Sequence, residues 1–135
     1  FASGSGLVGI AAKLAGAARV ICGDIDPYAG AAAGMNADLN SVEIEPVTDH
    51  LVGNAPECEV ILAGDVFYDR KFAVELPPWF ETCVQAGIDV YVGDPGRSYF
   101  PKSGFVLLAT YQVPVTRALE DAEVKRTTVW RYIPS

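Results

Sequence analysis

Hydrophobic residues recur along this chain with two different periods, which separate the expected helices from the expected strands. Helical spacing or helical composition marks three segments, at residues 7–17, 27–40 and 70–86. Apolar runs and alternating positions mark six strands, at residues 19–23, 42–49, 59–63, 89–92, 105–113 and 127–133. Because strands and helices alternate over most of the chain, we expect an α/β fold with a mainly parallel, Rossmann-like sheet and helices on both of its faces.

Local signals set the expected ends of the second and third helical segments. Asp26 is a suitable N-cap for the second segment, Pro27 suits its first turn, and Asn40 is a suitable stop. Pro77 and Pro78 interrupt the third segment, so we expect two short helices there and not one continuous helix.

Two features of the strands bear on their place in the sheet. The run at 59–63, which follows an expected loop at 51–57, is continuously apolar and predicts a central strand buried on both faces. Residues 117–126 are polar and charged, and they are too few for a crossover helix. The strands at 105–113 and 127–133 are therefore expected to pair as an antiparallel C-terminal hairpin.

A glycine-rich turn lies at the start of the chain. Gly4, Gly6 and Gly9 fit the G-x-G-x-x-G pattern, in which glycines let the backbone adopt positive φ and approach a nucleotide-type ligand. Asp24 follows Gly4 by about 20 residues, where a carboxylate can accept hydrogen bonds from ribose hydroxyls. A plain tight turn is the alternative for the glycines taken alone. Because the chain starts at Phe1 with no strand before this turn, we expect residues 1–135 to be the C-terminal part of a longer protein.

Composition excludes several kinds of partner. Half of the 135 residues are apolar and the formal net charge is −7, which predicts a folded domain and argues against nucleic acid as a partner. No apolar run approaches the roughly 20 residues that span a bilayer, so no membrane partner is expected. One histidine and three separated cysteines predict neither a metal site nor a disulfide. Cys22, Cys58 and Cys83 are expected to be small core residues in a reducing compartment, the cytoplasm.

Acidic residues follow four of the expected strands. Asp24, Asp49, Asp65 and Asp94 each come after an apolar segment. Ligands of parallel α/β sheets bind outside the carboxyl ends of the strands. We therefore expect these carboxylates to gather at one edge of the sheet and to mark the ligand site.

Five stretches of the sequence carry a family resemblance. They are residues 1–11, 24–29, 63–68, 93–97 and 120–130, which together run from one end of the chain to nearly the other. The chain resembles class I S-adenosylmethionine-dependent methyltransferases, and within them the electron-transfer-flavoprotein β-subunit lysine methyltransferases, near the ribosomal protein L11 methyltransferases. The sequences Asp-Val-Phe-Tyr at 65–68 and Asp-Pro-Gly-Arg at 94–97 are its most specific motifs. Ala2 replaces the first glycine of the usual D-x-G-x-G-x-G pattern, and the leading acidic residue would lie before Phe1.

The resemblance implies S-adenosyl-L-methionine as the cofactor and assigns residues to it. The backbone at Gly4 and Gly6 would lie beside the amino-acid part of the cofactor. Asp24 would bind the ribose hydroxyls, and Asp49 would lie beside the adenine. The full set of implied cofactor-binding residues is Ser3, Gly4, Ser5, Gly6, Asp24, Ile25, Asp49 and Asp65.

The resemblance also implies methyl transfer to an amine, the side chain of a protein lysine, with a flavoprotein subunit or a ribosomal protein as the candidate substrate. Asp65 would face this acceptor, with Phe67 and Tyr68 as aromatic walls, and these three are the implied catalytic residues. Methyl transfer from a sulfonium mainly needs alignment and exclusion of water. A lysine ammonium must first lose its proton, which a carboxylate can assist, and aromatic faces can stabilise a cation.

Most of these assignments have a structural alternative. Asp24 and Asp26 can cap the following helix, and Asp49 can be an ordinary acid of a loop. Phe67 and Tyr68 can be aromatic residues of the core. These alternatives stay open at the level of sequence.

Two further charged groups also allow two interpretations. Arg97 can bind a carboxylate or pair with Asp94. Glu120, Asp121 and Glu123 can form a solvated face or an acidic rim that docks a lysine-bearing protein.

Two other functions fit parts of the pattern. An NAD(P)-dependent oxidoreductase of Rossmann type uses the same glycine turn and acidic residue, but it predicts a parallel sixth strand and a separate substrate domain. A non-catalytic ligand-binding or scaffold domain would keep the fold without turnover.

Overall fold

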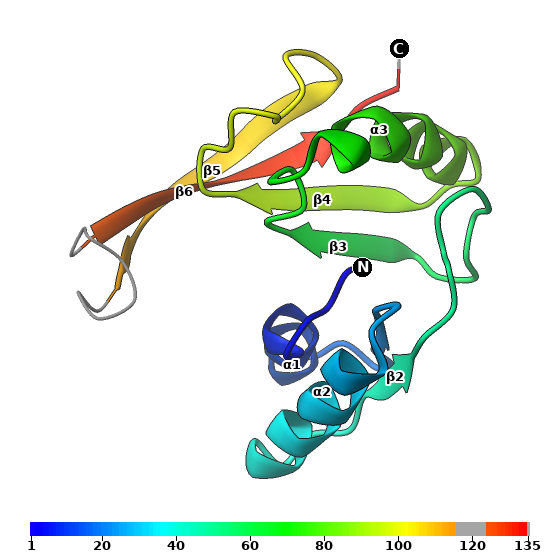
Figure 1. The fold of residues 1–135 in the computed structure, drawn as a ribbon, viewed down its shortest axis with the longest axis vertical. Coiled ribbons are helices and arrows are strands. Elements are labelled where there is room, and N and C mark those ends of the chain that lie inside the picture. Colours follow the sequence, from blue (N-terminus) through cyan, green and yellow to red (C-terminus); the bar gives the residue numbers. More distant parts are fainter. Residues whose placement is uncertain (116–123, 135) are drawn as a thin grey trace.

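The computed structural model describes residues 1–115 and 124–134. It contains three helices and six strands, arranged as in Figure 1. In chain order these are α1 (Leu7–Leu14), β1 (Ile21–Gly23), α2 (Pro27–Leu39), β2 (Glu45–Val47), β3 (Val60–Gly64), α3 (Arg70–Gln85), β4 (Asp89–Asp94), β5 (Phe105–Pro114) and β6 (Val124–Tyr132). The expected α/β alternation is confirmed, and β1 and β2 are shorter than their patterns predicted.

The strands form two sheets and not the single sheet expected. β1 pairs with β2 in parallel, while the larger sheet has the order β3-β4-β6-β5. Residues 1–3 lie between the two sheets: the amino group of Phe1 donates to the Leu62 carbonyl at 2.9 Å, and Ser3 N donates to the Gly23 carbonyl at 3.1 Å. One hydrogen bond to each side is too little pairing to make a strand, which is why the sheets remain separate.

The C-terminal strands pair as expected. β6 lies antiparallel to both β4 and β5, whereas β3 and β4 are parallel. The β5–β6 hairpin extends from the body of the molecule in Figure 1. Among the described residues, the strand beside β4 is the antiparallel β6, where an oxidoreductase of Rossmann type predicts a parallel strand.

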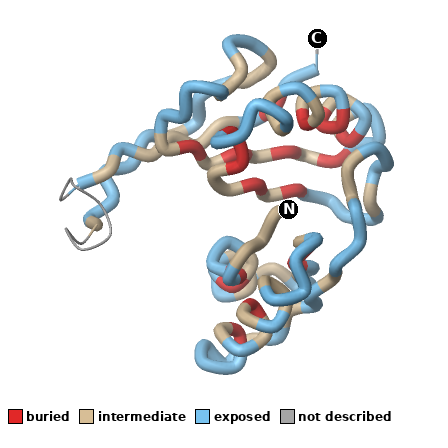
Figure 2. Tube along the Cα trace, in the orientation of Figure 1, coloured by how far each residue is buried: buried red, intermediate tan, exposed pale blue. Residues whose placement is uncertain are grey.

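One main core lies between α3 and the larger sheet. Leu76, Trp79 and Phe80 on α3 pack with Val90 and Val92 on β4, and all five side chains are buried. The buried segments of β3, β4 and α3 face one another in Figure 2. Burial of large aromatic and aliphatic groups is the main stabilising contribution.

Helix α3 corrects the expectation of two short helices. It runs without a break from Arg70 to Gln85 with Pro77 and Pro78 inside it. The prolines lack the N–H groups that would donate to the Ala73 and Val74 carbonyls. The buried face of α3 packs on the sheet on both sides of the prolines, and this packing outweighs the loss of those hydrogen bonds.

Strand β3 and one cysteine are less buried than expected. Ile61 and Ala63 are buried on the α3 side, but Val60 is 44% exposed and Leu62 is half-buried. Helix α1 contacts β3, whereas the Phe1 ring packs against α3, with Trp79 at a centroid distance of 4.9 Å. Cys58 is exposed because it lies in the loop that precedes β3.

Other local expectations are confirmed. The Asp26 side chain accepts from Tyr28 N at 2.9 Å at the start of α2, Pro27 takes its first turn, and Asn40 ends it. Glu120, Asp121 and Glu123 lie outside the described residues. Within the described part of the chain, the helices are too short or too polar to cross a bilayer. A cytoplasmic location stays a prediction.

Candidate active site

The glycine turn between residues 3 and 6 opens helix α1. Gly6 N donates to the Ser3 carbonyl at 2.9 Å, and both Gly4 (φ 50°) and Gly6 (φ 88°) have left-handed backbone conformations. Such φ values favour glycine over residues with a Cβ atom. The turn is tied to the carboxyl end of β1 through the bond from Ser3 N to the Gly23 carbonyl.

Small residues on α2 let that helix pack directly against the turn. A Cβ atom on Gly6 would lie 2.9 Å from Ala33 Cβ and 3.1 Å from Ala33 Cα. The side chain of Asn36, one helical turn further along α2, donates from Nδ2 to the Ser5 carbonyl at 2.9 Å. Ala33 and the Asn36 side chain therefore hold the glycine turn from one side. The sequence pattern did not identify Asn36 as a contact of this turn.

We expect Gly6→Ala to destabilise the protein by about 1–3 kcal/mol, because the new Cβ meets backbone and the residue must keep a positive φ. Urea unfolding followed by circular dichroism measures the loss. Gly4→Ala is the matched control: Gly4 also has a positive φ, but a Cβ there meets no atom within 4 Å. An equal loss in both variants would show that the contact with Ala33 contributes nothing.

Asp24 closes the glycine turn from the end of β1. Its Oδ2 accepts from Gly4 N at 2.9 Å and its Oδ1 accepts from Asp26 N at 3.0 Å. Each carboxylate oxygen can accept a second hydrogen bond, and the side chain is half-exposed. Asp24 therefore holds the turn and keeps acceptor capacity toward a ligand.

Two other predicted cofactor residues lie on the same edge. Ile25 is 71% exposed beside Asp24. Asp49 is exposed in the segment after β2, whose last residue, Val47, accepts from Asp24 N at 3.0 Å. The structure thus brings Asp49 to the same edge of the sheet as Asp24 without a contact that fixes its side chain.

The polar groups around the turn fit a small ligand that carries hydrogen-bonding groups. Ser3 Oγ is buried and has no hydrogen-bond partner among the described residues. Buried hydroxyls without partners are uncommon because they cost free energy. A Cβ atom on Gly4 would meet no atom within 4 Å, and each Asp24 oxygen can still accept a hydrogen bond. With the Ser3 hydroxyl, these features match a ligand that has amino, carboxylate and hydroxyl groups, as S-adenosylmethionine has.

Asp65 lies at the carboxyl end of the neighbouring strand β3. Its backbone is left-handed (φ 52°), and its N donates to the Gly93 carbonyl at 2.8 Å. Arg97 forms a two-pronged ion pair with it, from Nε to Oδ1 and from Nη2 to Oδ2, both at 2.8 Å. The hydrogen bonds and charge of Arg97 lower the pKa of the Asp65 carboxyl, against a smaller opposing effect of burial.

Asp94 builds the loop that carries Arg97. Asp94 is 2% exposed, and its Oδ2 accepts from Gly96 N at 2.7 Å and from Arg97 N at 2.8 Å. Its Oδ1 is buried with no partner among the described residues. Asp94 thus holds the Arg97 backbone, while the Arg97 side chain binds the carboxylate of Asp65, a partner that neither sequence interpretation of Arg97 named.

The two predicted aromatic residues take opposite positions. Phe67 is 0% exposed and packs edge-on against Phe100 and Phe105, at centroid distances of 5.3 and 6.0 Å. The expectation that Phe67 walls the acceptor pocket is therefore wrong, and the core alternative applies. Tyr68 is 59% exposed and contacts Phe72, so it remains on the surface near Asp65.

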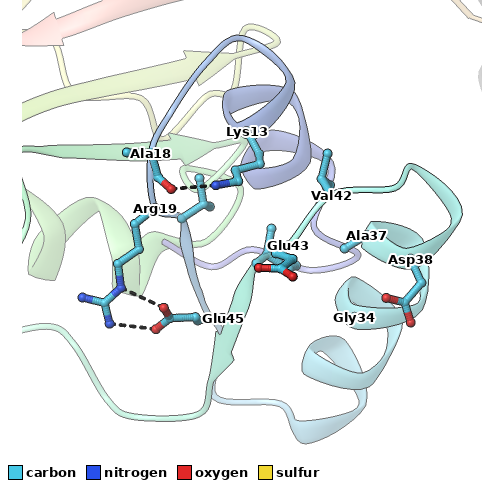
Figure 3. Close-up of a pocket in the computed structure, with 11 residues that line it drawn as sticks. Lys13, Ala18, Arg19, Gly34, Ala37, Asp38, Val42, Glu43 and Glu45 are labelled. Atoms are coloured by element: carbon cyan, nitrogen blue, oxygen red, sulfur yellow. Dashed lines mark hydrogen bonds and ion pairs between the residues drawn. The ribbon is translucent and has the colours of Figure 1, made fainter.

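One hollow lies at the other end of the small sheet, away from the glycine turn. It has a volume of about 380 Å³ and lies where α1 and α2 end and β1 and β2 begin. Figure 3 shows two internal contacts there, Arg19 with Glu45 and Lys13 with the Ala18 carbonyl, and the carboxylates of Asp38 and Glu43 at the same hollow. It contains none of the predicted site residues.

The family model and the curated relatives that match this chain are methyltransferases. The model of the family described as "Ribosomal protein L11 methyltransferase (PrmA)" matches residues 1–66. The electron transfer flavoprotein beta subunit lysine methyltransferase of Danio rerio is 39% identical over 136 residues, which cover 96% of this chain and 53% of that protein. The chain thus spans about half the length of the curated relatives it matches.

Solved structures agree on the fold. The ribosomal protein L11 methylase from Lactobacillus delbrueckii subsp. bulgaricus superposes with a TM-score of 0.62 at 19% identity, covering 97% of this chain and 66% of that chain. The magnesium protoporphyrin IX methyltransferase from Synechocystis PCC 6803 with bound SAH has a TM-score of 0.64 at 16% identity, covering 98% and 71%. At these identities the likeness establishes the fold alone.

Proposed function

The chain belongs to the class I methyltransferase fold and is related in sequence to the electron transfer flavoprotein beta subunit lysine methyltransferases; from this premise, we propose that it binds S-adenosylmethionine and serves methyl transfer to a protein lysine. The observation that carries the proposal is the bond of 2.9 Å from Gly4 N to Asp24 Oδ2. It joins the glycine turn to the acidic residue that follows β1, the two parts of a nucleoside site.

The residues of the glycine turn would hold the cofactor. Ser3, Gly4, Ser5 and Gly6 would surround its amino-acid part with backbone groups and the Ser3 hydroxyl. Asp24 would accept from the ribose hydroxyls, beside Ile25 and Asp49. When bound, S-adenosylmethionine supplies an electrophilic methyl group on a positively charged sulfur.

Asp65 and Tyr68 would receive the acceptor at the end of β3. A carboxylate that remains ionised can accept a hydrogen bond from the lysine nitrogen and hold it in place. The exposed ring of Tyr68 can contact the lysine stem and the cation by its face. Because Arg97 lowers the pKa of Asp65, this carboxylate is a weak base, and it orients the amine more than it removes the proton.

We propose the β subunit of an electron transfer flavoprotein as the protein substrate. The support is the name shared by relatives at 33–39% identity, of which the zebrafish protein is one. Ribosomal protein L11 is the second candidate, because the L11 methyltransferase family matches the first half of the chain. A methylation assay that offers both recombinant proteins with labelled S-adenosylmethionine separates the two.

The Asp65→Asn variant tests the acceptor side of the proposal. Replacing one acceptor oxygen by an amide N–H group, which also breaks the two-bond pair with Arg97, is expected to lower kcat/KM for methyl transfer by about tenfold, or about 1.4 kcal/mol of transition-state stabilisation. Binding of S-adenosylhomocysteine, measured by calorimetry, should change less than the rate.

Asp89→Asn provides the matched control. Asp89 lies at the amino end of β4, where it pairs with Arg131 at 2.6 Å and is 47% exposed, close to the 45% of Asp65. The control should keep the activity of the wild type. Methylation that survives Asp65→Asn unchanged would remove Asp65 from the acceptor site, and binding of S-adenosylhomocysteine without methylation of either protein would favour a non-catalytic ligand-binding domain.

A further inference from the structure

We propose that Arg97 is a positioning residue that neutralises Asp65, so that the acceptor lysine meets the site as a neutral amine. The inference rests on the proposed function, since it concerns the acceptor of that same site. It adds a role for the Asp-Pro-Gly-Arg motif at residues 94–97.

The contact between Arg97 and Asp65 has the geometry that a guanidinium group prefers with a carboxylate. Both oxygens of Asp65 accept from Arg97 at 2.8 Å, the parallel two-bond arrangement that is specific to guanidinium. The two residues are 32 positions apart and come from the ends of adjacent parallel strands, with Gly64 opposite Gly93 in the register. The pair is therefore a product of the sheet and not of local sequence.

Hydrogen bonds of Asp94 hold the loop that carries Arg97. The buried carboxylate of Asp94 binds the backbone N–H groups of both Gly96 and Arg97. Thr128 on β6 donates from Oγ1 to the Asp94 carbonyl at 3.1 Å and ties the same residue to the next strand. Arg97 is thus held at its backbone by a side chain that is itself 2% exposed.

Neutralising Asp65 favours methyl transfer because of the state of the acceptor. The lysine nitrogen forms the new N–C bond with its lone pair, while the electron pair of the breaking C–S bond passes to sulfur. The ammonium form has no lone pair, so one proton must leave to water before transfer. A lone carboxylate beside the nitrogen stabilises the ammonium and raises the pKa of the lysine, whereas a neutral ion pair does so much less.

Other charges near Asp65 do not replace Arg97. Lys125 on β6 also lowers the pKa of Asp65, but by less than Arg97 does. Asp94, on the adjacent strand, adds a negative charge that is engaged by two backbone N–H groups on one oxygen. Of these groups, Arg97 is the one that donates hydrogen bonds to the Asp65 carboxylate.

The test is the pH dependence of methyl transfer by Arg97→Gln. The probe is recombinant electron transfer flavoprotein β subunit, with L11 protein in parallel, and labelled S-adenosylmethionine. The unpaired Asp65 should shift the acid limb of kcat, which reports groups in the enzyme–substrate complex, upward by about one pH unit. The value of kcat should therefore fall about tenfold near neutral pH and recover in alkali. KM should also fall near neutral pH, because the exposed carboxylate binds the ammonium form.

Three controls separate this role from a structural one. Arg131→Gln breaks the comparable pair with Asp89 at the other end of the sheet and should leave the pH profile unchanged. Arg97→Lys keeps the charge and should restore most of the wild-type profile. The double variant Asp65→Asn, Arg97→Gln carries neither charge, so its acid limb should return close to that of the wild type.

The outcomes distinguish failure of this inference from failure of the proposed function. Methyl transfer by Arg97→Gln with a wild-type acid limb, lowered equally at every pH, would overturn the role of Arg97 alone. Absence of methyl transfer by the wild type would overturn the proposed function. Titration of the Asp65 carboxyl by ¹³C NMR tests the Asp65–Arg97 pair without a measurement of activity. The pKa of Asp65 must be higher in Arg97→Gln than in the wild type, and an unchanged pKa contradicts the inference.

Discussion

Asp24→Ala is expected to weaken binding of S-adenosylhomocysteine by about 100-fold, because one substitution removes two functions of the same carboxylate. The first is the acceptor for ribose hydroxyls, where a charged hydrogen bond contributes about 1.5–3 kcal/mol. The second is the pair of bonds to Gly4 N and Asp26 N, which hold the glycine turn against the end of β1. Calorimetric titration of the folded protein measures the change.

Asp26→Ala is the matched control for this prediction. Asp26 lies two residues away, and among the described residues its side chain bonds only to Tyr28 N, as the N-cap of α2. Its loss should cost about 1 kcal/mol of stability and leave affinity nearly unchanged. If Asp24→Ala and Asp26→Ala weaken binding equally, Asp24 acts through the loop alone; if a nicotinamide dinucleotide binds in place of S-adenosylhomocysteine, the methyltransferase proposal is wrong.

Local chemistry made the glycine turn and the position of Asp24 beside it predictable from the sequence. Glycine marks positions that need a positive φ, and Gly4 and Gly6 both have one. Asp24 follows an apolar strand by one residue, which places its side chain at the edge of a sheet. These inferences depend on neighbours within a few residues or on strand order, both of which the pattern of hydrophobic positions contains.

The partners of Asp65, on the proposed acceptor side, could not be predicted from local sequence patterns, because they come from other strands. Asp65 and Arg97 are each marked by motifs, but their pairing requires β3 and β4 to lie side by side in one register. Lys125 approaches Asp65 from β6, through an antiparallel pairing whose register the sequence does not specify. For such groups the sequence identifies candidates, and the fold selects the partners.

Helix α3 shows the same limit in the core. The rule that proline ends helices considers only the backbone, and by that rule Pro77 and Pro78 divide the segment. Leu76 precedes the prolines and Trp79 and Phe80 follow them, and all three are buried against the sheet. Tertiary packing of these side chains keeps the helix continuous, which no count of propensities along the chain would show.

The bend at Asp65 explains why Phe67 lies in the core and not at the predicted site. In a strand, side chains alternate between faces, so Val66 and Phe67 should point in opposite directions. The left-handed backbone of Asp65 (φ 52°) ends that alternation, and Val66 and Phe67 are both buried, with exposures of 1% and 0%. Tyr68 is the first residue after the turn to return to the surface.

Phe67→Ala is therefore expected to act on stability and not on chemistry. Removing a fully buried ring that packs against Phe100 and Phe105 should cost about 3–5 kcal/mol of unfolding free energy, a large part of the stability of a small domain. Phe67→Leu retains most of the buried volume and should cost only about 1.5 kcal/mol. Urea unfolding of the three proteins measures both differences.

Tyr68→Ala completes this experiment, because the two aromatic neighbours should give opposite results. Tyr68 is 59% exposed, so its loss should change stability by about 0.5 kcal/mol or less but lower methyl transfer by about tenfold if its ring contacts the acceptor. Folded Phe67→Leu, by contrast, should transfer methyl groups at the wild-type rate. A stable Phe67→Leu protein with a selective loss of kcat would return Phe67 to the acceptor site, and a Tyr68→Ala protein with full activity would leave Asp65 as the remaining predicted contact.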